Sequence, residues 1–238
     1  MHITILTLFP EIFNGVFESS ILGKSLVNNI WSLDLVNIRD FAESKNKEVD
    51  DKTYGGGRGR IIRADVLAKC LDNAILKMSE TPRIIYTSPR GKLITQNKIR
   101  ELSDSQNIIF ICGRYEGIDQ RIIDAYNVEE ISIGDFVLTG GEIPVMAIVD
   151  AVVRLLPGTI KNTEFDDEES FNNNLLEYDQ FTIPADVQIN GKVFSVPHEL
   201  TSGNHSVIQK YRYENSKIIT AKKRPDIWAK FVKSKFEK

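Results

Sequence analysis

The segment SIGDFVLTGGEIP (residues 132–144) decides the fold, because it links a short apolar run to a strongly apolar helical stretch through a glycine-rich loop. Two earlier segments repeat this arrangement, since SPRGK (88–92) and CGRYEGIDQR (112–121) also follow β-branched apolar runs of strand length. In open α/β sheets, the loops at the carboxyl ends of the strands form the ligand site. We therefore expect these three loops to meet at one edge of a sheet.

Strands and helices alternate from residue 2 to residue 156. Apolar, β-branched runs predict strands at residues 2–9, 33–38, 83–88, 107–112 and 129–133. Helical spacing or apolar composition predicts helices at residues 64–78, 95–103, 118–126 and 144–156. This alternation predicts an α/β fold with a mostly parallel sheet that is covered on both faces.

Two stretches without periodicity divide the chain. Residues 39–60 are charged and glycine-rich and are predicted to form a long loop. Residues 158–174 are polar and acidic, as in a flexible linker. We expect three parts: a domain of residues 1–160, a linker of residues 161–174, and a small helical domain of residues 175–238. Helices in the last part are predicted at residues 206–213 and 225–236.

The charge of the chain is concentrated at one end. Residues 210–238 hold ten Lys and Arg against three acidic residues, a charge of +7, so the net charge of −3 leaves −10 for the remainder. Such asymmetry indicates either a surface that binds a polyanion or a solvated terminal helix.

The cysteine content and the apolar runs favour a cytoplasmic protein without membrane contact. Cys70 and Cys112 cannot form a disulfide framework, and neither has other metal ligands at a useful spacing. No apolar run approaches the ~20 residues of a membrane span. The opening HITILTLF (2–9) is interpreted as a first strand rather than a signal peptide.

The glycine pattern indicates what kind of ligand the three loops accept. The first strand is followed by Phe9, Pro10 and Glu11, so the G-x-G-x-x-G fingerprint of dinucleotide-binding domains does not occur there. Glycine lets a ligand approach backbone N–H and C=O groups closely. Three such loops favour an adenine edge and a zwitterionic amino-acid tail over a pyrophosphate.

Five motifs carry a resemblance to a known family. They are RDFAESKNKEVDDKTYGGGRG (39–59), YTSPRG (86–91), CGRYEGIDQR (112–121), SIGDFVLTGGE (132–142) and SGNH (202–205). In order and approximate spacing they closely resemble the TrmD-type tRNA (guanine-N(1))-methyltransferases of the SPOUT superfamily, and the resemblance extends over nearly the whole chain.

This resemblance implies a SPOUT-type fold with a deep trefoil knot, an obligate homodimer, and a tRNA site built from both subunits. The implied reaction transfers a methyl group from S-adenosylmethionine to N1 of the guanosine immediately 3′ of the anticodon, and the family also uses Mg²⁺. The residues implied to bind S-adenosylmethionine are Tyr86, Ser88, Pro89, Gly113, Tyr115, Glu116, Gly117, Ile133, Gly134, Asp135, Phe136, Val137, Leu138, Gly140 and Gly141.

The resemblance also implies two catalytic residues. The guanine ring nitrogen carries a proton at neutral pH, so a base must remove it while a cation meets charge on the carbonyl oxygen. The family's base is an aspartate before Ser-Phe, and here that position is Glu169, with Glu168 as an alternative. Arg154 matches the family's cation, although Asp150 one turn earlier equally permits a helix salt bridge.

Further residues have two interpretations each. The resemblance implies tRNA contacts at Arg58, Gly59, Ser170 and His205, whereas a glycine cluster alone indicates only a flexible turn. Glu116 and Asp119 are either metal ligands or capping and structural acids. Asp135 either meets the methyl donor or stabilises its turn.

Departures from the family pattern leave alternative functions open. The family usually has an apolar residue in place of Arg60, and an arginine in place of Ile183. Together with Glu169, these changes suggest a catalytically silent RNA-binding relative. Another alternative is a SPOUT enzyme that acts on ribosomal RNA or on a ribose hydroxyl. The intact loops favour an enzyme, and the carboxylate before Ser-Phe favours base methylation in tRNA.

Overall fold

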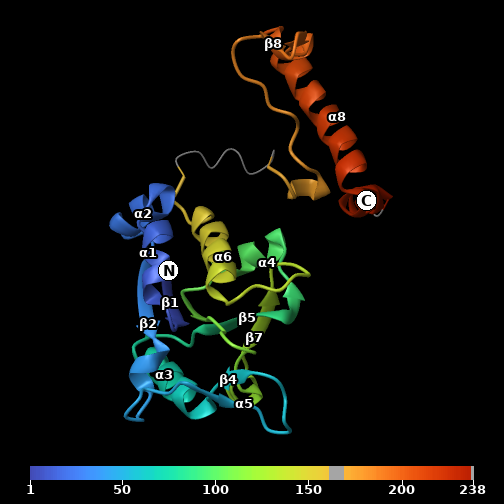
Figure 1. Ribbon diagram of the computed structural model, residues 1–238. Helices are drawn as coiled ribbons and strands as arrows, with labels where there is room; N and C mark the ends of the chain where they lie inside the picture. The colour runs from blue at the N-terminus through green and yellow to red at the C-terminus, as the bar shows by residue number, and fades with distance from the viewer. Residues whose placement is uncertain (161–168, 237–238) are drawn as a thin grey trace. The chain divides into compact units, whose positions relative to one another are not determined.

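The computed structural model describes residues 1–160 and 169–236, so that Glu168 and part of the predicted linker lie outside the described residues. The chain divides into two compact units, Met1–Lys161 and Asn162–Lys238. Figure 1 traces the chain through both. None of the described helices is long and apolar enough to cross a membrane.

The first unit is built on a five-stranded sheet in the order β2-β1-β6-β5-β7, and each neighbouring pair is parallel. The strands are β1 (His2–Thr7), β2 (Ser32–Asn37), β5 (Arg83–Leu93), β6 (Asn107–Ile111) and β7 (Glu129–Ser132). The predicted α/β class with a mostly parallel sheet is thereby confirmed. The trefoil knot stays a prediction.

Helices cover both faces of this sheet. Successive side chains of a strand point to opposite faces, so the central strands contribute to two separate cores. Ile108 and Phe110 face one core, and Ile109 and Ile111 face the other. The first core lies under η1 (Pro10–Phe13), α1 (Asn14–Phe17), α2 (Ser20–Val27), α4 (Gln96–Ser103) and α6 (Glu142–Arg154). The second lies under η2 (Ile38–Phe41), α3 (Ala64–Leu76) and α5 (Gln120–Ala125). Figure 1 shows α6 and α3 on opposite sides of the sheet.

The stretch of residues 39–60, predicted as a loop, contains regular structure. β3 (Asp50–Lys52) pairs with β4 (Arg60–Ile62) in an antiparallel hairpin. The Arg60 side chain crosses this hairpin, with Nε bonded to the Asp50 carboxylate and Nη2 donating to the Asp50 carbonyl oxygen at 2.8 Å. The two strands are only three residues each, and they are joined by this ion pair between residues ten apart and by the burial of Ile62 in the second core.

The SPRGK segment, also predicted as a loop, is continuous with strand β5. Thr87 and Lys92 both face Ile131 of β7, so residues 88–91 bulge out of the ladder between them. The bulge gives these residues the freedom of a loop while strand pairing resumes after it.

The second unit contains a β-hairpin as well as helices. Its elements are η4 (Asn172–Asn174), β8 (Asp186–Ile189), β9 (Lys192–Ser195), α7 (His198–Thr201), α8 (His205–Lys223) and α9 (Pro225–Phe236). Helix α9 matches its prediction, and α8 continues ten residues beyond the predicted Tyr213. The hairpin was not predicted. It turns at Asn190 and Gly191, whose φ values of 52° and 75° suit a two-residue hairpin turn.

Candidate functional site

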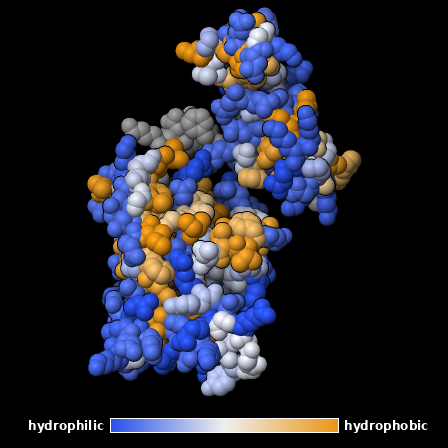
Figure 2. Space-filling model, viewed as in Figure 1, coloured by the Kyte–Doolittle hydropathy of each residue, from blue (hydrophilic) through white to orange (hydrophobic). Residues whose placement is uncertain are grey.

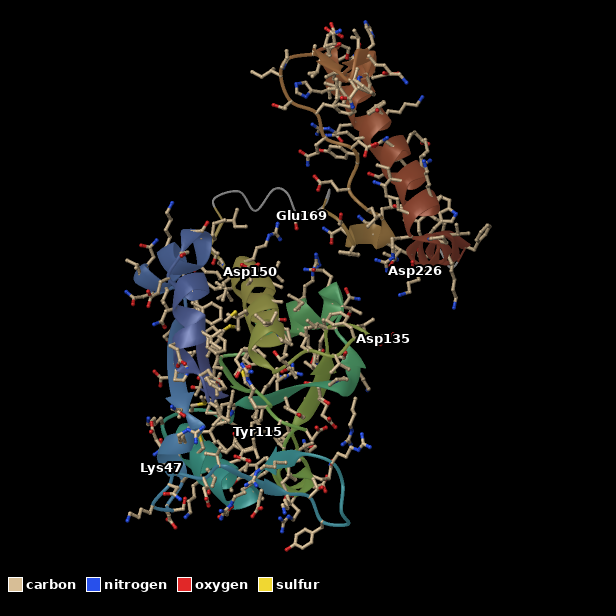
Figure 3. All side chains as sticks on the ribbon, viewed as in Figure 1. Lys47, Tyr115, Asp135, Asp150, Glu169 and Asp226 are labelled. Atoms are coloured by element: carbon tan, nitrogen blue, oxygen red, sulfur yellow. The ribbon has the colours of Figure 1, made fainter. Side chains whose placement is uncertain are left out.

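A cavity of about 260 Å³, called the first cavity below, lies at the carboxyl ends of β5, β6 and β7. All three predicted loops contribute to its wall, which confirms that they meet at one edge of the sheet. Of the residues that the sequence analysis assigned to a ligand, the wall includes Tyr86, Ser88, Pro89, Gly113, Tyr115, Glu116, Gly117, Ile133, Gly134, Phe136, Val137, Leu138, Gly140 and Gly141. Asp135 is exposed and lies outside this wall. In Figure 3, Asp135 and Tyr115 lie well apart in the first unit.

Glycines allow the second and third loops to pack directly on each other. The Gly141 N–H donates to the Gly113 carbonyl oxygen at 2.9 Å. A Cβ atom at Gly141 would lie 2.9 Å from Cys112 Cα, and one at Gly113 would lie 2.7 Å from the Tyr86 ring. Any larger residue at these positions would push the loops apart and change the shape of the cavity.

Tyr86 forms a neutral aromatic part of the wall. Its side chain is 8% exposed, and burial together with the nearby charge of Glu130 raises the pKa of its hydroxyl. A hydrogen bond with the backbone of Ile118 acts in the opposite direction. The phenol therefore stays protonated at neutral pH and presents both an apolar ring and a polar tip to a ligand.

Tyr115 connects the first cavity to the β3–β4 hairpin. Burial and a hydrogen bond with Asp50 raise the pKa of its hydroxyl, and Arg39 opposes this shift. The backbone makes the same connection, because Glu116 N donates to Arg60 O and Ile62 N donates to Gly117 O, both at 2.9 Å. Gly59 has a φ of 79°, and a Cβ atom there would collide with the Glu116 side chain. The loop predicted to meet tRNA is thus attached to the wall of the cavity.

Glu142 and Arg114 are site residues that the sequence analysis did not assign. The Glu142 side chain is only 2% exposed, accepts a hydrogen bond from Thr7 Oγ1 at 2.9 Å, and lies 2.9 Å from Arg114 Nε. Arg114 also stacks on the Phe9 ring, 4.5 Å from its centroid. This buried ion pair joins the end of β1, the loop after β6 and the first turn of α6. The sequence feature that could have indicated this role is Glu142 itself, a single acid at the start of the apolar helix α6.

Neither predicted catalytic residue lines the first cavity. Arg154 is the exposed last residue of α6, where a cation complements the helix dipole. Glu169 belongs to the second unit, where it is half-buried and lines a different cavity with residues of α8 and α9. Figure 3 labels Glu169 at the start of the described part of the second unit.

The residues predicted to contact tRNA are held by local structure. Ser170 Oγ accepts a hydrogen bond from Glu177 N at 3.0 Å. His205 is the first residue of α8, and Asn204 before it caps the helix by accepting from Ser206 N and Val207 N. The SGNH motif therefore forms the turn between α7 and α8. Arg58 is exposed in the turn between β3 and β4.

The acids and thiols near the site have structural surroundings. Asp119 caps α5 by accepting from Arg121 N at 2.9 Å and also pairs with the Arg121 side chain. Within residues 1–160 and 169–236, no group of three or more His, Cys, Asp or Glu is placed to hold a metal ion. Cys112 is fully buried, and burial raises the pKa of its thiol well above the usual value, so it is a poor nucleophile.

Fold and cavity together define an α/β protein with a cavity at the carboxyl ends of three neighbouring parallel strands. The family model described as "tRNA (Guanine-1)-methyltransferase TrmD" matches residues 1–230, and the chain belongs to this family. The chain is 46% identical to a "tRNA (guanine-N(1)-)-methyltransferase" of Rickettsia akari over 235 residues, which cover 95% of this chain and 97% of the relative. It is 44% identical to a protein of the same name from Brucella ovis, over 98% of this chain and 94% of the relative.

Replacing Glu142 tests the buried ion pair. We expect Arg114→Gln to lower the free energy of unfolding of the first unit by about 3–5 kcal/mol, because it leaves the buried Glu142 carboxylate uncompensated, and Glu142→Gln to lower it less, because the Arg114 side chain is 21% exposed. The chain has two tryptophans, so a Trp228→Phe background leaves Trp31 as the reporter of the first unit during urea unfolding. The double variant should lose much less than the sum of the two. Additive losses would show that the two side chains are not coupled.

Proposed function

We propose that this protein transfers a methyl group from S-adenosylmethionine to N1 of the guanosine immediately 3′ of the anticodon in tRNA. The observation that carries this proposal is the first cavity, whose wall collects the glycine-rich loops of three adjacent parallel strands in a chain of the tRNA (Guanine-1)-methyltransferase TrmD family. In this proposal residues 1–160 bind the methyl donor in a knotted pocket, residues 161–174 carry the base, and residues 175–238 bind tRNA in the cytoplasm.

The first cavity fits an adenosyl ligand. Ile133, Phe136 and Leu138 offer apolar surface to a purine, while the glycines expose backbone N–H and C=O groups to its edge. A Cβ atom at Gly113, Gly140 or Gly141 would meet neighbouring protein atoms at 2.9 Å or less, so the wall of the cavity can pack this closely only with glycine at these positions. When bound, S-adenosylmethionine supplies an electrophilic methyl group that needs little further activation.

The residues of this chain have to activate the acceptor. In the proposed reaction the bond from sulfur to the methyl carbon breaks as the bond from that carbon to guanine N1 forms. Glu169 accepts the proton that leaves N1, and Arg154 stabilises negative charge on the carbonyl oxygen of the base. The guanine must also leave its stack to reach the methyl group.

Magnesium has no complete binding site among the described residues. Glu116 supplies one carboxylate at the first cavity, and Asp119 is already paired with Arg121. Mg²⁺ commonly takes one or two protein carboxylates and completes its six oxygen ligands with water or substrate phosphates, so one carboxylate at the cavity does not define a site. We therefore assign no step of the reaction to a metal ion.

A homodimer is part of the proposal. Several large apolar side chains of the first unit are substantially exposed, among them Phe9, Ile12, Val16, Phe136 and Ile143. Figure 2 shows hydrophobic side chains gathered on the visible face of this unit. Contiguous exposed apolar surface marks association sites, and a second copy of the chain is the partner that the family implies. Phe136 also lines the first cavity, so such a contact would lie beside the methyl donor.

A methyl-transfer assay tests the proposed function. Purified protein is incubated with labelled S-adenosylmethionine and unmodified tRNA that carries guanosine 3′ of the anticodon, and the nucleosides are then identified. We expect 1-methylguanosine, and none from a matched tRNA with adenosine at that position. A ribose-methylated product would indicate the alternative SPOUT reaction. The absence of any methylated nucleoside, with RNA still bound, would indicate a silent binder.

Glu169→Gln tests the assignment of the base. The amide keeps the size of the side chain but cannot accept the N1 proton, so we expect turnover to fall by at least 10²-fold. Calorimetry should find the affinity for S-adenosylmethionine within a few-fold of the unaltered protein, since Glu169 does not line the first cavity. Turnover close to normal would show that another group accepts the proton.

Arg154→Ala separates the two roles considered for this cation. We expect the rate of methyl transfer to fall more than the affinity for S-adenosylmethionine, because the charge acts on the guanine carbonyl. Arg154→Lys should restore part of the rate. If thermal unfolding shows instead that Arg154→Ala mainly destabilises the first unit, the arginine has a structural role in α6.

A further inference from the structure

A second cavity, of about 480 Å³, lies between the segment 169–178, α8 and α9 of the second unit. It differs from the first cavity in its chemistry, because aromatic, amide and basic side chains share one wall. The residues that matter below are Asn172, Asn174, Tyr178, Arg212, Tyr213 and Lys235. The mechanism proposed above uses none of them.

The aromatic side chains offer flat surfaces. The Arg212 guanidinium lies over one face of the Tyr178 ring, 4.7 Å from its centroid, and the Lys217 ammonium lies over one face of the 45% exposed Tyr213 ring, at 4.9 Å. A base would therefore stack on the opposite face of either ring or of the guanidinium. Proteins recognise single-stranded RNA by stacking splayed-out bases on aromatic rings and on arginine planes. Such stacking tolerates any base, because each base has a π-face.

The amide side chains belong to a segment whose backbone has unusual dihedral angles and is held by hydrogen bonds. Phe171, Asn173 and Asn174 have φ values of 75°, 50° and 56°, in the left-handed region that non-glycine residues seldom adopt. Phe171 N donates to Leu175 O at 2.7 Å, and Leu176 N donates to the fully buried Thr220 Oγ1 at 2.8 Å. Strained backbone that is held in this way is common at binding sites. An asparagine amide has both donors and an acceptor, as the hydrogen-bonding edges of bases require.

The surrounding charge favours a nucleotide over an apolar peptide. Lys235 of helix α9 lines the cavity, and the segment of residues 210–238, which includes this helix, has a net charge of +7. A phosphate attached to a bound base would therefore meet favourable potential.

We propose that the second cavity binds an unpaired nucleobase of the tRNA substrate, adjacent to the guanosine that is methylated. This inference rests on the proposed function, which makes RNA the substrate and Glu169 the base. The reacting guanine must present N1 to the methyl donor, so the base held by the second cavity is its neighbour. Because Glu169 lines this cavity too, holding the neighbour would also position the acceptor beside the carboxylate.

The test combines protein variants with an abasic scan of the RNA. Binding of the full-length protein to a fluorescent anticodon stem-loop is measured by anisotropy without any methyl donor, so failure of catalysis does not affect the readout. Each loop nucleotide in turn is replaced by an abasic residue. For the unaltered protein, we expect one position next to the target guanosine to lose about tenfold or more in affinity, the loss expected for one stacked base.

Tyr213→Leu should weaken binding of the intact stem-loop by a similar factor and remove the penalty of that one abasic position. Lys235→Gln in the cavity is compared with Lys230→Gln on the same helix, because both remove one charge and only Lys235 lines the cavity. Only the Lys235 change should alter the abasic profile. Circular dichroism and Trp228 fluorescence check the folding of each variant. Abasic profiles that are the same for the folded Tyr213→Leu and unaltered proteins would overturn the proposal.

Discussion

The backbone of Gly141 lies against the backbone of Gly113, and the first cavity depends on this approach. Their hydrogen bond of 2.9 Å joins the loop after β6 to the loop that enters α6. Glu142 and Arg114 directly follow these two glycines, and their buried ion pair fixes the same junction through side chains. One close contact therefore sets the distance between two walls of the cavity, and the glycines are needed because a Cβ atom would prevent it.

The loop after β6 is also held by the β3–β4 hairpin, which contacts it at residues 116–119. Ile62 N donates to Gly117 O, and Asp119 N donates to Ile62 O, so β4 extends the backbone contacts of the cavity wall toward the glycine cluster at residues 55–57. The Arg60 side chain secures the hairpin through Asp50, which also bonds to Tyr115. The arginine that departs from the family pattern thus has a structural role in this chain, and it need not signal a lost activity.

The sequence predicted the parallel sheet well, because strands such as β6 are buried on both faces and read as continuous apolar runs. It did not predict β3 and β4, because three residues each are too few to show periodicity and the contact between Asp50 and Arg60 is not visible in a local pattern. The β8–β9 hairpin was predictable in principle from Asn190-Gly191 between alternating apolar residues. The burial of Glu142 and the exposure of Asp135 depend on the path of one loop, which no local pattern encodes.

The glutamate at position 169 is easier to understand when the two units are considered separately. In a rigid site, moving a base by about one carbon–carbon bond would cost on the order of 10²-fold in rate. Here the Glu169 carboxylate belongs to the second unit, and the residues after it are held by hydrogen bonds within that unit. Phe171 N donates to Leu175 O, and Glu177 N donates to Ser170 Oγ. The wall of the first cavity does not include Glu169. In the proposed reaction the bound tRNA engages both units, so RNA contacts set the distance from carboxylate to guanine. In that reaction a longer side chain would be compensated by a small change in how the second unit binds the RNA, so a glutamate at position 169 is compatible with the proposed mechanism.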